Sequence, residues 1–175
     1  MTHPFSWLTP ASYKPVFALL SVLLLGLSAW LMSLDQALVN DQTPQGIVSF
    51  ELAGSAAKAA AILDSWDAPA RENAHSIQGL DNLYLLVYPL WFALAVTMLT
   101  AKLGHASQRF GYAAAWLVLL AIPLDLTENY ALLQQLQGGA NQRWAQLALL
   151  CAVPKFALVL LGAGATLGLT GVRLL

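Results

Sequence analysis

Apolar residues follow one another along most of the chain in long runs that few charged residues interrupt. Residues 82–101 carry no charged side chain, and neither do residues 15–34, while residues 144–168 carry only Lys155. A helix that crosses a bilayer needs about 20 mostly apolar residues. These runs predict spanning helices at about residues 15–34, 80–101 and 144–168.

A further uncharged run, residues 110–124, is too short to span a membrane by itself. It reaches spanning length only if the same helix continues past Asp125 and Glu128 to about residue 133. We therefore predict another span at residues 110–133, with two acids inside it.

The long connection between the first two spans also predicts a helix, at about residues 44–65. Thr43 and Pro44 supply an N-cap and a first-turn proline, and the alanine-rich run that follows favours helix. Glu51, Ser55 and Lys58 would form one polar stripe on this helix. Either the helix lies at the membrane surface with the stripe towards water, or Glu51 turns inward over the bundle.

The predicted fold class is all-α. We expect a four-helix transmembrane bundle with an additional amphipathic helix between spans one and two. Residues 1–175 would form a single integral membrane domain.

Composition agrees with a membrane protein and excludes several other classes. The chain is 58% hydrophobic and only 10% charged, whereas soluble proteins have about 25% charged residues. Its net charge of −1 gives no reason to expect nucleic acid as a partner. A single cysteine, Cys151, excludes an internal disulfide and a cysteine-rich metal site.

The positive charges outside the spans set the expected orientation, because cytoplasmic loops are enriched in lysine and arginine. One side of the predicted bundle has a slight excess: Lys14, Lys102, Arg109 and Arg173 against Lys58, Arg71 and Arg143. We therefore expect a multi-pass protein of the inner cell membrane, with both termini in the cytoplasm.

Polar residues inside the spans are the candidate functional residues, because ionisable groups are costly in lipid and normally face a cavity or a partner. On span three, Asp125, Glu128 and Asn129 share one helix face. The other candidates come from spans two and four and from the connecting helix: Asp81, Tyr84, Tyr88, Lys155 and Glu51.

Depth predicts which of these residues meet. With a rise of 1.5 Å per residue, Lys155 lies about 16 Å from Trp144, and Asp125 lies about 12 Å from Leu133. Since the two depths are similar, we expect Lys155 to pair with Asp125 or Glu128. One acid of such a cluster would remain unbalanced and is a candidate for handling protons.

Prolines occur in the middle of three spans, as Pro89, Pro123 and Pro154. Each removes a helix hydrogen bond, and three kinks at similar depth would open a pocket. The alternative is that these prolines are simply the ones that membrane helices tolerate.

We expect no cofactor and no metal. His3, His75 and His105 all lie outside the spans, which argues against a haem within the bundle. Asp125 and Glu128 offer few oxygen ligands for a metal ion, and Lys155 competes for both.

Three short motifs together resemble a family of small bacterial four-span membrane proteins that has no known activity. The motifs are E-x-A-G-[ST], D-x-x-E-N and a late K-F, which here begin at Glu51, Asp125 and Lys155. The resemblance implies that these residues, with Glu128 and Asn129, form the polar set of the family.

Three functions are compatible with these features. The polar cluster would bind a membrane lipid or another amphiphilic small molecule, or would belong to an accessory subunit of a larger membrane protein partner. Alternatively, the chain is a small proton-linked transporter. A further alternative is a membrane-embedded enzyme that uses its carboxylates as general acid and base.

Overall fold

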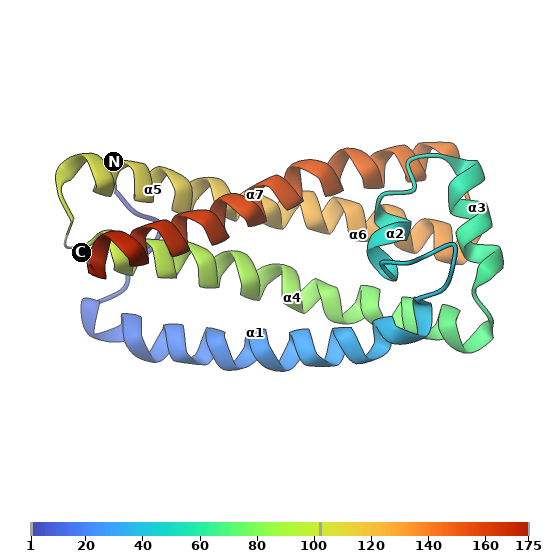
Figure 1. Ribbon diagram of the computed structural model, residues 1–175, viewed down its shortest axis with the longest axis horizontal. Coiled ribbons are helices and arrows are strands. Elements are labelled where there is room, and N and C mark those ends of the chain that lie inside the picture. The colour runs from blue at the N-terminus through green and yellow to red at the C-terminus, as the bar shows by residue number, and fades with distance from the viewer. Residues whose placement is uncertain (1, 102, 175) are drawn as a thin grey trace.

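The computed structural model describes residues 2–101 and 103–174, and within them the protein is helical without strands. Four helical stretches are long and apolar enough to cross a membrane. They run side by side, with both termini at one end of the bundle and the connection between spans one and two at the other (Figure 1). The predicted four-helix bundle with an additional helical segment is confirmed.

The four stretches consist of five long helices. They are α1 (Tyr13–Asp35), α4 (Ala68–Thr100), α5 (His105–Leu119) continued by α6 (Ala121–Gly138), and α7 (Gln142–Leu174). Short 3-10 turns, η1 (Pro10–Ser12) and η2 (Gln36–Leu38), extend α1 at its two ends. At 33 residues each, α4 and α7 are about 50 Å long and exceed the roughly 30 Å of a hydrocarbon core.

The third stretch is interrupted where α5 meets α6. The amide of Leu120 donates to the carbonyl of Leu117, which closes a tighter turn, and Pro123 has no amide to offer the carbonyl of Leu119. Pro89 and Pro154 lie inside uninterrupted helices. Of the three intramembrane prolines, Pro123 is therefore the one that breaks its helix.

Packing places α4 at the centre of the bundle. It packs against α1, α5, α6 and α7, and α6 packs closely against α7. By contrast, α1 packs mainly on α4 and has no buried residue. The first span therefore forms a wall of the bundle and contributes little to its core.

The segment expected to form one helix at residues 44–65 is divided into α2 (Ile47–Glu51) and α3 (Ala56–Ser65). Gly54 separates them with a φ of 68°, and a Cβ there would lie 2.7 Å from the Leu149 side chain. Ser55 then caps α3 by accepting the amide of Lys58. The prediction of a continuous polar stripe is therefore wrong, because Glu51 and Lys58 lie on different helices.

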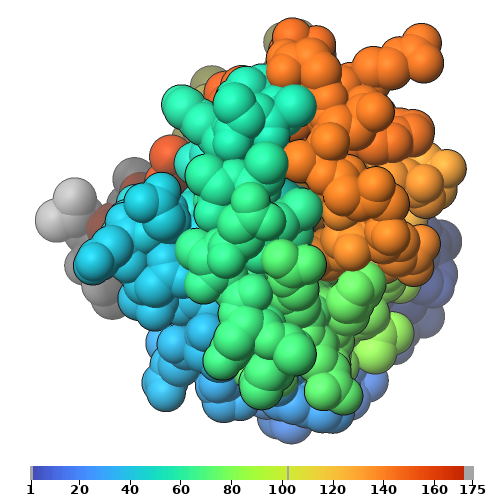
Figure 2. Space-filling view, turned by 90° about the vertical axis from the view of Figure 1, so that its right-hand side faces the viewer, coloured from blue at the N-terminus to red at the C-terminus, as the bar shows by residue number. Residues whose placement is uncertain are grey.

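This segment covers one end of the bundle, where Figure 2 shows it in light blue and teal beside the start of α4 in green and the start of α7 in orange. The Asp35 carboxylate, at the end of α1, accepts the amide of Ile47 at 2.7 Å. The indole of Trp66 donates to the carbonyl of Leu38 at 3.0 Å. Around Trp66 lies an apolar cluster that includes Phe50 and Leu132.

A second apolar cluster fills the half of the bundle next to the termini. Leu94, Val96 and Leu169 belong to it, together with Phe5 from the N-terminal segment. The polar residues of the spans lie between these two clusters.

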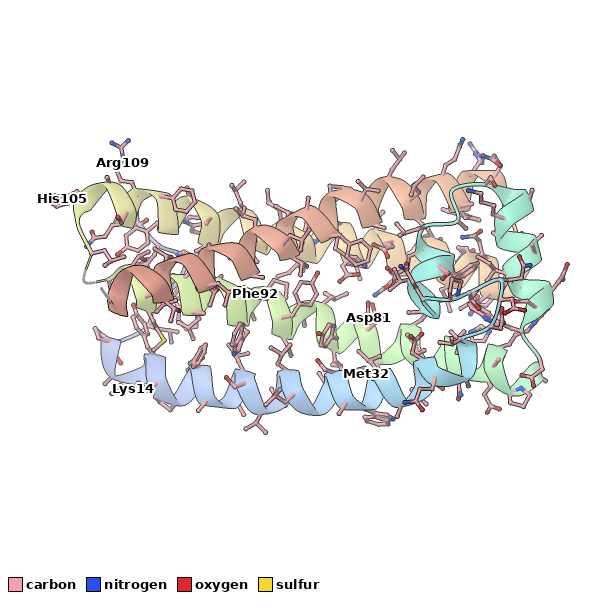
Figure 3. All side chains as sticks on the ribbon, viewed as in Figure 1. Lys14, Met32, Asp81, Phe92, His105 and Arg109 are labelled. Carbon is pink, nitrogen blue, oxygen red and sulfur yellow. The ribbon has the colours of Figure 1, made fainter. Side chains whose placement is uncertain are left out.

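The basic residues used to predict orientation separate between the two ends. Lys14 and Arg109 lie at the end with the termini (Figure 3), whereas Lys58 is on α3 at the opposite end. Lys102 and the side chain of Arg173 lie outside the described residues.

Candidate functional site

A buried lysine forms the centre of the site. The Lys155 amine contacts Glu128 Oε1 at 2.8 Å, Asp125 Oδ1 at 3.2 Å and Glu51 Oε2 at 3.4 Å. The Lys155 side chain is 8% exposed, and that of Glu128 is fully buried. An ammonium group has three protons to donate, so these three acids occupy all of them.

Local structure explains why these acids meet the lysine. Asp125 and Glu128 lie one turn apart on α6, which presents both to α7. Glu51 is the last residue of α2, just before the turn at Gly54 that lies against Leu149 of α7. The short α2 thus brings an acid from outside the spans into the bundle.

Hydrogen bonds connect further polar residues to this cluster. The Tyr88 hydroxyl donates to Asp125 Oδ2 at 3.0 Å, and Asn129 donates its amide to Asp81 Oδ2 at 2.7 Å. On the α1 side, Ser28 donates to the Tyr84 hydroxyl at 3.2 Å. Asp125 is therefore held from two sides, by Lys155 and Tyr88.

Acids outnumber bases in the cluster. Glu51, Asp125 and Glu128 contact a single lysine, and a fourth acid, Asp81, lines the same cavity. Glu128 Oε2 has no hydrogen-bond partner among the described residues. Among those residues, no group of histidine, cysteine and acidic side chains is arranged to hold a metal ion. The Lys155 ammonium occupies the position between the acids.

A cavity of about 450 Å³ lies beside the cluster, between α1, α2, α4, α6 and α7. Its polar lining comes from Glu51, Asp81, Tyr84, Tyr88, Asp125, Lys155 and Ser28. Leu24 and Leu25 of α1 and Val159 of α7 line its apolar part. Because Leu25 is also 71% exposed, this part opens at the side of the bundle.

A smaller hollow of about 140 Å³ adjoins this cavity and shares Glu51 and Asp81 with it. It is lined by α1, α2 and α4 and includes Met32 and Asp35. Figure 3 shows Asp81 near α2 and Phe92 further towards the middle of the bundle. The polar group is thus reached from the side, near the end covered by α2 and α3.

The predicted pairing of Lys155 with an acid of span three is confirmed, and both Asp125 and Glu128 take part. Of the two alternatives for Glu51, the structure has the inward one, because this side chain reaches Lys155. All the other candidates lie in the same region: Asp81, Tyr84, Tyr88 and Asn129.

The apolar lining of the cavity and the contribution of α1 were not predicted from the sequence. Ser28 of α1 and Phe92, Phe156 and Val159 all line the cavity. A signal was present for α1, since Ser21 and Ser28 are seven residues apart in the uncharged run of the first span. Both face α4, and Ser21 accepts the Trp91 indole at 2.8 Å.

Each of the three motifs has a structural role in this region. In E-x-A-G-S, Glu51 binds the lysine and Gly54 makes the turn. D-x-x-E-N supplies the two acids that bind Lys155 and the Asn129 amide that donates to Asp81. In K-F, the Phe156 ring lies 4.9 Å from the Lys155 amine, close enough for a cation–π contact.

No protein-family model, curated protein or solved structure matches the chain. The resemblance to a four-span family therefore stays a prediction. The fold and the site define a multi-pass membrane protein with a buried lysine–carboxylate cluster.

Proposed function

We propose that the protein binds a lipid-like or amphiphilic molecule, with the polar head at the Lys155 cluster and the tail between α1 and α7. The observation that carries this proposal is the composition of the cavity. Acids and hydroxyls line its inner part, and leucine and valine line the part that opens at the side. Such a division matches a molecule with one polar and one apolar end.

The size and position of the cavity also support this function. A volume of about 450 Å³ lies within the usual range for small-molecule sites. Because Leu25 on the exposed face of α1 also lines the cavity, an amphiphile would enter from the bilayer without crossing the bundle.

We further propose that the bundle lies in the inner cell membrane, with the termini in the cytoplasm and α2 and α3 on the external side. The positive charges at the terminal end support this orientation. A tag placed after residue 175 should then be protected in intact cells. A cysteine replacing Lys58, an exposed residue of α3, should react with an impermeant thiol reagent added outside. Labelling of the tag from outside would contradict the orientation.

Native mass spectrometry of the protein released from lipid nanodiscs tests the binding function. We expect a retained amphiphile, which Val159→Trp should displace because the larger side chain fills the cavity. The matched control is Leu160→Trp, since the neighbouring residue is 72% exposed and lies outside the cavity lining. Equal retention by both variants, or no retained amphiphile in the unchanged protein, would refute the proposal.

A further inference from the structure

Asp81 differs from the other acids of the cluster because Lys155 does not neutralise it. The lysine uses its three protons on Glu51, Asp125 and Glu128. Among the described side chains, no ion pair includes Asp81. Its observed side-chain partner is the neutral amide of Asn129, at 2.7 Å from Oδ2.

Asp81 also faces open space. It is partly buried, and it lines both the large cavity and the adjoining hollow. A carboxylate in such a low-dielectric position is costly unless a positive charge or several hydrogen-bond donors accompany it. The protein supplies one neutral donor to Asp81. The open space next to this carboxylate and its negative charge therefore suit a bound cation.

Most of the other polar groups of the cavity favour a ligand that donates hydrogen bonds. Ionised carboxylates such as Glu51 and Asp125 can only accept. The Tyr88 hydroxyl already donates to Asp125, and the Lys155 amine is fully used. A hydrogen-bond donor on the ligand would therefore find acceptors in the cavity wall.

We propose that the head group of the ligand is a protonated primary or secondary amine and that it docks on the Asp81 carboxylate. This inference rests on the proposed function and specifies the chemical class of its ligand. An ammonium group supplies both the missing charge and the missing N–H donors. The aromatic ring of Tyr84, one turn from Asp81 on α4, also lines the cavity and favours a cation next to it.

The amine also fits better than two other cations. A quaternary ammonium head has the charge but no N–H to give to the carboxylates. A bare metal ion would need several oxygen ligands, and Asp125 and Glu128 are already engaged by Lys155. The hydrocarbon chain of the amine would pass Leu24 and Val159 towards the bilayer.

Competition between amphiphiles of one chain length tests which head group the site prefers. The unchanged protein in phosphatidylcholine nanodiscs is given equal amounts of dodecylamine, dodecanol and dodecyltrimethylammonium, and the bound species are counted by native mass spectrometry. We expect dodecylamine to bind about tenfold or more tightly than the alcohol, and more tightly than the quaternary ion. Equal binding of amine and alcohol would overturn the amine assignment but not the proposed function, whereas no bound amphiphile would overturn both.

Variants at Asp81 test the docking residue. Asp81→Asn keeps the shape and removes the charge, so dodecylamine should bind about tenfold more weakly or worse while dodecanol is unaffected. Asp81→Glu keeps the charge and should retain the preference for the amine. Asp41→Asn, in the exposed connection before α2, is the matched control. Unchanged dodecylamine binding in a folded Asp81→Asn protein, or loss of the preference in a folded Asp81→Glu protein, would refute the role of Asp81.

Discussion

Replacement of Lys155 by methionine removes the positive charge that three buried acids share. Methionine fills a similar space, so the change tests charge more than packing. The lost contacts are those at 2.8, 3.2 and 3.4 Å to Glu128, Asp125 and Glu51. Hydrogen bonds to charged groups contribute about 1.5–3 kcal/mol each, but the acids can take up protons once the lysine is gone, which limits the total.

We therefore expect Lys155→Met to lower the free energy of unfolding by about 3–5 kcal/mol, the usual cost of breaking a buried ion pair. Denaturant titration in mixed micelles, followed by circular dichroism, measures this quantity. The loss should shrink at acid pH, because protonated carboxyls need no counter-charge. It should also shrink when Glu128→Gln is added, since one fewer acid is then left unpaired.

The matched control is Lys58→Met on α3, an exposed lysine whose replacement should change the free energy of unfolding by less than about 0.5 kcal/mol. A loss below about 1 kcal/mol for Lys155→Met at neutral pH would refute the reasoning. It would mean that the acids around Lys155 are uncharged in the folded protein and need no lysine.

Two further substitutions test the geometry of the site. Gly54→Ala should lower the free energy of unfolding by about 1–3 kcal/mol, because a side chain is strained at a φ of 68°, whereas Gly79→Ala, in open space on a helix, should leave it unchanged or raise it by up to about 1 kcal/mol. Thermal unfolding of both variants measures this difference in stability, and equal unfolding midpoints would contradict the strain expected at Gly54. Tyr88→Phe should cost about 1–3 kcal/mol in the same assay, because Asp125 loses a buried donor at 3.0 Å. Tyr130→Phe, which alters a 54% exposed side chain, is its control, and a Tyr88→Phe midpoint as high as that of the control would argue against the bond.

The fold and the central ion pairs could be predicted because both follow from simple periodicities. Runs of apolar residues mark the spans, and the fixed rise of a helix places Lys155 at the depth of Asp125 and Glu128. These predictions require the spacing of residues within each helix. The ion pairs also need α6 to lie against α7, as it does in the structure.

The connection between spans one and two could not be predicted in the same way. Its alanine-rich sequence favours one helix, but the chain turns at Gly54 with a φ of 68°, at a place where a side chain would clash with Leu149 of α7. Tertiary packing here overrides local propensity, and that packing directs Glu51 into the bundle. The sequence shows Glu51 as one member of a polar stripe, which left its direction open.

A pocket was one of the alternatives that the intramembrane prolines left open, but its lining and its opening could not be predicted, since they depend on which helices are neighbours. Its opening exists because α1 packs on α4 and leaves its other faces uncovered. The residues of α1 that line it, such as Leu24 and Leu25, look like any lipid-facing leucine in the sequence.

The position of α1 at the edge of the bundle has a consequence for motion. A helix without buried residues can shift as a rigid body without leaving a void in the core, and lipid tails replace the apolar contacts that it gives up. Two side-chain hydrogen bonds tie it to α4, from Ser28 to Tyr84 and from Trp91 to Ser21. A rigid-body shift of the first span would break these two hydrogen bonds and change the width of the entrance, and we expect the ion pairs between α6 and α7 to stay in place during such a shift.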